Sequence, residues 1–187
     1  MPKDKTLTHA KLMEAMKREF LEKGYENAAM NVIASAAGIT PAGIYRHFRN
    51  KDEMFSALVE PVISELDRMC ESDMQCMNQE DYDPFSVEVI IRWIDFFYDN
   101  FEEWKLLVCC SHGSAFQGFL NHMIQTEHES MLHFYPSLSG KKSRFIAGTF
   151  INALVLPIIE DMTKEEAKEH ALFIRDFLYP GWKQLLT

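Results

Sequence analysis

The chain has 187 residues, of which 47% are hydrophobic and 25% charged, and its 28 acidic and 19 basic residues give a net charge of −9. This composition argues against a disordered or fibrous chain and is typical of a globular protein with one or two domains. The charged opening segment argues against a secretory signal, and Asn152 and Pro157 interrupt the richest apolar run, 145–159. We therefore expect a soluble, cytoplasmic protein with reduced cysteines.

The charge is divided unevenly along the chain. Residues 1–51 carry a net charge of +4, which leaves −13 for residues 52–187. Lys and Arg supply most of the affinity of proteins for phosphate, so the basic segment suggests a polyanionic partner. The acidic remainder is expected to have a separate task.

Helical periodicity extends over nearly the whole chain, and no segment shows a strand pattern. In the first part we expect a helix from Thr8 to Gly24 and a short helix over 31–37. A third helix is opened by Thr40 and Pro41 and ends near Phe48. A fourth runs from Lys51 toward Met77 and is bent at Pro61. Further helices are expected over 85–100, with Asp83 as its cap, and over 102–110, 114–135 and 141–159. A capping box of Thr163 and Glu166 opens the last helix, which is expected to end before Pro180. The predicted fold class is all-α, with about nine helices.

The segment 31–48 has the pattern of a helix-turn-helix. Ala34 supplies a small residue where two helices approach, Gly38 permits a turn with positive φ, and three isoleucines anchor the two helices: Ile33, Ile39 and Ile44. In such motifs the second helix enters the major groove of DNA with its N-terminal end toward the bases. A plain helical corner remains the alternative at this point.

From Leu12 to Phe55 the sequence resembles the N-terminal DNA-binding domain of the TetR family of transcriptional regulators. The resemblance is carried by GY at 24–25, IASAAGI at 33–39, IYRHF at 44–48 and NK at 50–51. It implies a homodimer with a DNA-binding domain over 1–51 and an effector-binding and dimerisation domain over 52–187. It also implies repression from a palindromic operator, relieved by a small effector.

The resemblance assigns roles to individual residues. Thr40 matches a helix cap that touches phosphate, Tyr45 and His47 match aromatic positions near the DNA backbone, and Lys51 matches a phosphate-binding lysine. The predicted DNA contacts are Asn31, Thr40, Pro41, Ala42, Gly43, Tyr45, Arg46, His47 and Lys51.

Two positions depart from the family pattern. Ala42 and Gly43 have no side-chain donors or acceptors for bases, so recognition would depend on thymine methyl contacts, on Arg46 and on DNA shape. Ala29 stands where the family commonly has a capping Thr, a loss of about 1 kcal/mol unless Asn27 or Asn31 replaces the cap.

The acidic segment contains aromatic residues at helical spacing, which fit either core packing or a ligand cavity between helices. We expect a largely apolar or aromatic effector bound by Trp93, Phe96, Phe97, Trp104, Phe116, Phe119 and Met123. The eighth helix is almost wholly apolar and the ninth is amphipathic, which fits either burial within the monomer or a partner copy; the family resemblance favours a dimer formed through these two helices. The predicted dimer interface comprises Phe145, Gly148, Asn152, Val155, Phe173, Ile174 and Phe177.

An alternative is a helical metal-binding protein or enzyme. His122, Glu129 and His133 form a polar stripe at helical spacing, and Cys109 and Cys110 are vicinal thiols that could sense metals or oxidants. No catalytic or nucleotide-binding motif occurs in the chain. The leading prediction therefore includes no catalytic residue, metal or cofactor.

Overall fold

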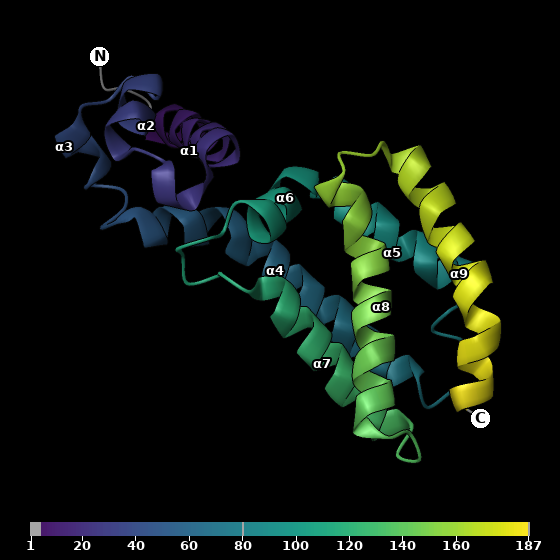
Figure 1. Cartoon of the computed structure of the whole chain (residues 1–187). Coiled ribbons are helices and arrows are strands. Elements are labelled where there is room, and N and C mark those ends of the chain that lie inside the picture. The colour runs from purple at the N-terminus through teal and green to yellow at the C-terminus, as the bar shows by residue number, and fades with distance from the viewer. Residues whose placement is uncertain (1–4, 80, 187) are drawn as a thin grey trace. The chain divides into compact units, whose positions relative to one another are not determined.

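The computed structural model describes residues 5–79 and 81–186, and within them the protein is built from helices (Figure 1). In chain order these are α1 (Lys5–Asn27), α2 (Met30–Ala36), α3 (Pro41–Ile44), α4 (Lys51–Cys76), α5 (Val87–Asp99), α6 (Phe101–Cys109), α7 (Phe119–Phe134), α8 (Gly140–Ile159) and α9 (Lys164–Leu186). The expected all-α class is confirmed.

The chain forms two compact units. The N-terminal unit contains Met1–Glu65 and Glu102–Gly118, and the C-terminal unit contains Leu66–Phe101 and Phe119–Thr187. The helix-turn-helix segment is therefore packed together with α6 and the first half of α4. The assignment of DNA binding to 1–51, and of effector binding and dimerisation to 52–187, stays a prediction.

An aromatic cluster forms the core of the N-terminal unit. Phe20, Tyr25 and Phe55 contact one another, with ring centroids 5.1, 5.4 and 6.0 Å apart. Ile33 and Ile44 are fully buried and attach the two short helices to this core. Within this unit, Lys17 links α1 to α6 through ion pairs with Glu102 and Glu103.

In the C-terminal unit, α8 packs against both α7 and α9, and α5 packs against α9. Ser143 of α8 is fully buried and ties α8 to α7, because its hydroxyl donates to the His128 carbonyl and lies 2.7 Å from His128 Nδ1. Phe85, Phe150 and Trp182 form a second aromatic cluster with centroids 5.3 to 6.1 Å apart.

Several helix boundaries differ from the predictions. The last helix was expected to end before Pro180, but α9 continues through it to Leu186. A proline inside a helix removes one backbone hydrogen-bond donor and costs free energy. In α9 the burial of Trp182, which is 5% exposed and packs on Phe85, offsets this cost. The prediction for the end of α9 was therefore wrong.

The other differences are local. The first helix already includes Lys5, before Thr8, and its regular part ends at Gly24, whose φ is +71°. The third helix ends at Ile44 instead of near Phe48, and the seventh begins at Phe119 instead of Ser114. The cap of α5 is Ser86, not Asp83, because the Ser86 hydroxyl accepts from the Val89 N–H.

By length and composition α8 is apolar enough to cross a membrane. Core helices of globular proteins meet the same criterion, and one such helix is weak evidence for a span. Within the C-terminal unit the inner face of α8, including Ile146, Ala147 and Leu154, is buried against protein. We therefore treat α8 as a core helix.

Candidate DNA-binding and effector-binding sites

The turn between α2 and α3 depends on Gly38. The Gly38 N–H donates to the Ser35 carbonyl and the Ile39 N–H donates to the Ala34 carbonyl, each at 3.0 Å, which is the Schellman pattern of helix ends. Gly38 has a φ of +70°, and no atom lies within 4 Å of a Cβ built there. Glycine is thus needed for its backbone conformation and not for space.

The start of α3 is capped as the sequence predicts. Thr40 is the N-cap, and its hydroxyl accepts a 3.1 Å hydrogen bond from the Gly43 N–H. A Cβ at Gly43 would lie 3.2 Å from that hydroxyl oxygen, so the cap leaves little room for a larger residue. Thr40, Pro41 and Ala42 are exposed, as a recognition helix requires.

The other predicted DNA contacts lie on the same unit. Asn31, Arg46 and His47 are exposed, and Tyr45 is 60% exposed with its hydroxyl 3.8 Å from Met30 Sδ. The His47 ring lies 6.4 Å from that of His9 on α1. These side chains are available to a partner from solvent.

The N-terminus of α2 has no side-chain cap and is held instead by a contact from α1. Ala29 makes no side-chain cap, but its N–H donates to Glu19 Oε1 at 3.1 Å. Neither Asn27 nor Asn31 supplies a side-chain cap, and Asn27 instead donates to the Lys23 carbonyl. Glu19 is only 9% exposed, so α1 supplies a buried acceptor to the first turn of α2.

Replacing Glu19 with alanine should therefore lower the free energy of unfolding by about 1–2 kcal/mol, because the Ala29 N–H loses its acceptor. Chemical denaturation measures this change. Ala29→Thr should not recover this loss in the Glu19→Ala background, because its hydroxyl would accept from an N–H of the first turn of α2 and not from its own N–H. A Glu19→Ala variant as stable as the wild type would contradict this role of Glu19.

Lys51 has a structural role besides its predicted DNA contact. Its ammonium donates to the carbonyls of Glu26 at 2.9 Å and Ala28 at 3.4 Å, at the C-terminal end of α1, and lies 4.7 Å from the Tyr25 ring centroid. The next residue, Asp52, accepts from the Tyr25 hydroxyl at 2.5 Å. Lys51 is thus held at the junction of α1 and α4.

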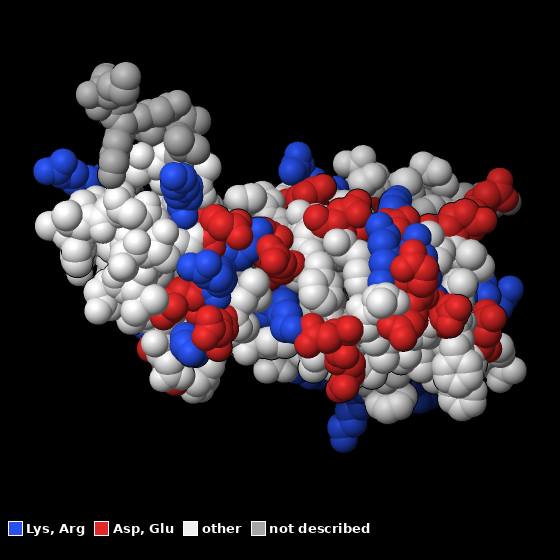
Figure 2. Space-filling view, turned by 90° about the horizontal axis from the view of Figure 1, so that it is seen from above, with Lys and Arg blue, Asp and Glu red and all other residues white. Residues whose placement is uncertain are grey.

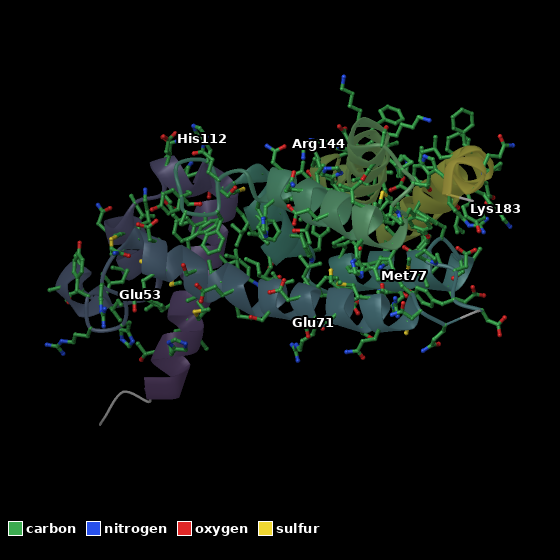
Figure 3. All side chains as sticks on the ribbon, turned by 90° about the horizontal axis from the view of Figure 1, so that it is seen from below. Glu53, Glu71, Met77, His112, Arg144 and Lys183 are labelled. Carbon is green, nitrogen blue, oxygen red and sulfur yellow. The ribbon has the colours of Figure 1, made fainter. Side chains whose placement is uncertain are left out.

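The start of α4 is fixed by a reciprocal cap. The Glu53 N–H donates to Asn50 Oδ1 at 2.8 Å, and Glu53 Oε2 accepts from the Arg49 N–H at 2.5 Å. Figure 3 marks Glu53 at this end of the helix. The same pairing holds the backbone of the predicted DNA-binding loop.

The seven residues predicted to bind an effector are not all in one unit. Trp104 and Phe116 belong to the N-terminal unit, whereas Trp93, Phe96, Phe97, Phe119 and Met123 belong to the C-terminal unit. Trp93 contacts Phe96 and Phe97, with ring centroids 6.1 and 6.0 Å apart. The aromatic wall formed by these three residues is compatible with either core packing or a ligand, and its binding role stays a prediction.

The outer face of α8 and α9 carries a groove of about 500 Å³. Four of the residues predicted for the dimer interface line it: Phe145, Gly148, Asn152 and Ile174. Phe173 and Phe177 are 67% and 74% exposed, and their rings stack with centroids 6.4 Å apart. The prediction that Val155 belongs to the dimer interface is wrong. Val155 is fully buried on the inner face of α8, one turn from Ile151, and is not available to a partner.

The polar stripe of α7 does not gather into a metal site. Among the described residues, no group of three or more His, Cys, Asp or Glu side chains could hold a metal ion. Glu129 accepts from Gln125, which in turn accepts from Arg144 of α8. His122 and His133 are exposed. Cys109 is exposed, and burial raises the pKa of the neighbouring Cys110 thiol.

A pair of carboxylates that the sequence reasoning missed faces the interior of the C-terminal unit. Asp73 of α4 forms an ion pair with Arg92 and accepts from Trp93 Nε1 at 3.1 Å. Glu127 of α7 is half-buried, and burial together with the charge of Asp73 raises its pKa from 4.5 to about 7. The sequence spacing on α7 could have indicated that Glu127 faces inward, because Met123, Glu127 and Met131 recur every four residues and both methionines are buried.

Figure 2 shows one face of the molecule, on which acidic side chains are spread over the C-terminal unit and interleaved with basic ones. Several of these are paired, including Lys164 and Lys168, which both contact Asp95 at 3.0 and 2.7 Å. The excess of acidic residues in the C-terminal unit therefore lies on a surface where several of them form ion pairs with lysines.

A Schellman turn, a capped short helix and exposed polar side chains around it define a helix-turn-helix protein. Residues 12–58 match the model of the bacterial regulatory proteins of the tetR family. The HTH-type transcriptional regulator TtgR of Pseudomonas putida is 40% identical over 53 residues, which are 28% of this chain and 25% of TtgR. AcrR of Shigella flexneri, also an HTH-type transcriptional regulator, is 26% identical over 133 residues, 70% of this chain and 60% of AcrR. Residues 12–58 are therefore similar to the N-terminal part of tetR-family regulators.

Solved structures share the fold over the full length. The match to a TetR-like regulator from Rhodococcus sp. RHA1 includes 96% of this chain and 98% of that regulator, at a TM-score of 0.65 and 15% identity. NalD of Pseudomonas aeruginosa, the secondary repressor of the MexAB-OprM multidrug efflux pump, covers 98% of both chains at a TM-score of 0.57 and 19% identity. The match to TtgR, in contrast, spans only a quarter of that relative.

Proposed function

We propose that the protein is a homodimeric transcriptional repressor of the cytoplasm that binds a palindromic operator and is released from it by a small, largely apolar or aromatic effector. The observation that carries the proposal is the capped α3 with exposed residues around it, in a segment that matches the tetR family model. NalD, which shares the fold, is a repressor, and this supports repression as the mode of control here.

The interface with DNA would combine phosphate contacts and limited base contacts. Thr40, Tyr45, His47 and Lys51 would hold the backbone. Arg46, which is exposed just after the C-terminal end of α3, is the long side chain that would reach toward the bases. Pro41, Ala42 and Gly43 would lie against the base edges without donating hydrogen bonds from side chains. Sequence preference would then depend in part on the shape of the operator.

The second copy would cover α8 and α9. Phe145, Phe173 and Phe177 expose large aromatic surfaces beside the groove, and a monomer rarely leaves such a patch open to water. A two-fold axis would place the same face of each copy against the other. Two DNA-binding heads would then read two half-sites about one helical turn, or a small multiple, apart.

The rival function, a metal-binding protein or enzyme based on the polar stripe of α7, has no comparable support. His122, Glu129 and His133 lie among no larger group of ligands in the described residues, and Glu129 is engaged with Gln125. The relatives named above are regulators.

Selection of DNA from a random pool tests the proposal directly, and the enriched sequences should be palindromic.

Lys51→Ala should then weaken binding to the selected site and reduce its salt dependence by about one unit of slope, because one phosphate contact is lost. Tyr45→Phe should weaken binding by about threefold to tenfold, because one hydroxyl contact to the backbone is lost.

Lys23→Ala is the matched control, since Lys23 is exposed on α1 and paired with Glu22. It removes the same charge and should leave the salt dependence nearly unchanged. Circular dichroism separates loss of contact from loss of fold in Lys51→Ala, since Lys51 also holds the end of α1. Unchanged operator binding by both Lys51→Ala and Tyr45→Phe would contradict this docking.

A further inference from the structure

Two histidines lie side by side on the surface of the N-terminal unit. His9 belongs to the second turn of α1, and His47 follows the C-terminal end of α3. Their ring centroids are 6.4 Å apart, and both side chains are exposed. His47 is one of the predicted contacts to the DNA backbone, so the ring of His9 extends the same surface onto α1.

Packing fixes the position of the His9 ring. It stacks on the ring of Phe48, with centroids 6.4 Å apart and an angle of 26° between the two planes. Phe48 is 7% exposed and belongs to the core of the unit. Because Phe48 directly follows His47, this buried ring anchors both the His9 side chain and the segment that carries His47.

No acidic side chain among the described ones neutralises this pair. Within the described part of the chain, His9 and His47 have only the ring contacts given above and form no ion pair. The short helices α2 and α3 contain no charged residue. On α1 the nearest charged positions, Lys11 and Glu14, lie two and five residues beyond His9 and thus on other faces of the helix.

The segment around His47 is basic, and its carboxylates are engaged. Three basic side chains lie on this segment: Arg46, Arg49 and Lys51. Asp52 and Glu53, at the start of α4, already accept hydrogen bonds from other groups of the unit. In their protonated form the two imidazoles therefore have no counterion among the described residues, and an anion from outside can supply one.

The charge of imidazole changes between about pH 5 and pH 8, a range in which the backbone phosphates of DNA are always anions. Two imidazolium rings this close repel each other in the free protein, and a phosphate beside both of them offsets that repulsion. Imidazolium also donates stronger hydrogen bonds to phosphate oxygens than neutral imidazole does. Protonation of the pair and binding of a phosphate should therefore favour each other.

We propose that His9 and His47 in their protonated form together bind one backbone phosphate of the operator, and that operator affinity therefore rises as the pH falls; this rests on the proposed function as a DNA-binding regulator. By linkage, binding that favours the protonated pair takes up protons from solution. Each proton adds a positive charge next to the phosphate, so the salt dependence becomes steeper as the pH falls. His9 is then a DNA contact outside the helix-turn-helix.

Titration of the selected operator at pH 6 and pH 8, in phosphate-free buffers of equal ionic strength, tests the proposal by fluorescence anisotropy. In the wild type the dissociation constant should be at least about tenfold lower at pH 6, and the slope of its salt dependence steeper there by about one unit. In His9→Gln this ratio should fall to about threefold or less, because one of the two titrating charges is gone. His9→Lys carries a permanent charge, so its affinity at pH 8 should exceed that of the wild type and its ratio should also fall.

His112→Gln is the matched control, since His112 is another exposed histidine of the N-terminal unit but lies by Glu26, at the opposite end of α1. It should keep the wild-type ratio between the two pH values. An equal dissociation constant at both pH values in the wild type, or a wild-type ratio in His9→Gln, would overturn the proposal. Weakening of His9→Gln by the same factor at both pH values would also overturn it, because loss of the stack on Phe48 does not depend on pH.

The same titrations separate this inference from the proposed function. If no operator can be selected and bound at either pH, the proposed function is refuted. Operator binding that is intact but does not change with pH refutes this inference alone.

Discussion

Replacing both Phe173 and Phe177 with aspartate is expected to convert the proposed dimer into a monomer and to weaken operator binding by at least about a hundredfold. The two rings are 67% and 74% exposed and stack on each other on the outer face of α9. Burial of one such ring contributes roughly 1.5–3 kcal/mol, and a two-fold interface would bury each ring twice. A hundredfold change corresponds to about 2.8 kcal/mol, well within the expected loss.

Sedimentation equilibrium measures the dimer dissociation constant, and titration of the selected operator measures DNA affinity. A monomer would engage one half-site at a time and so lose the gain from two linked heads. Val87→Asp is the matched control, since Val87 is 43% exposed at the start of α5 and the change has the same chemistry away from the groove. A double variant that remains dimeric at the wild-type dissociation constant would place the interface elsewhere.

The second large effect is on the pH dependence of stability and comes from Glu127. Burial and the charge of Asp73 raise its pKa from 4.5 to about 7 in the folded protein. Between these values the native state holds a proton that the unfolded state has released, so this group's contribution to stability is full below about pH 4.5 and is lost as the pH rises to about 7. At pH 8 the ionised carboxylate then costs roughly 3 kcal/mol, at 1.36 kcal/mol for each pKa unit.

Glu127→Gln removes that cost. The variant should be more stable than the wild type by roughly 3 kcal/mol at pH 8 and by little at pH 4.5. Urea denaturation at the two pH values measures the difference. The other groups that face this region remain in both proteins, so most of their titration cancels: Cys70, Asp73, Tyr82, Arg92 and Tyr135. The same gain at both pH values would show that Glu127 is not the titrating group.

The existence and order of the helices were predictable because each depends on local signals. The capping box of Thr163 and Glu166 forms as expected, with hydrogen bonds of 2.8 and 3.3 Å between them. The Gly38 turn and the Thr40 cap also follow from the conformational range of glycine and the acceptor of threonine. These are interactions within a few residues of the chain.

The predictions that were wrong depended on residues distant in sequence. Pro180 ends no helix, because Trp182 gains burial against Phe85, which lies on a different segment. The Ala29 N–H donates to Glu19, ten residues earlier, and no neighbouring asparagine caps α2. Val155 is buried on the inner face of α8 whereas Asn152 is exposed on the outer face, and which face is inner depends on the elements that pack against the helix.

By itself the sequence determined the helical class, the helix-turn-helix and the split of the net charge of −9 into a basic head and an acidic remainder. These features arise from periodicity, caps and local charge, which need no knowledge of distant contacts. Only the tertiary structure decided which acidic residues are paired and which are not. Asp73 and Glu127 look alike in the sequence, but Arg92 neutralises the first and no described residue neutralises the second, because ion pairing depends on proximity in space.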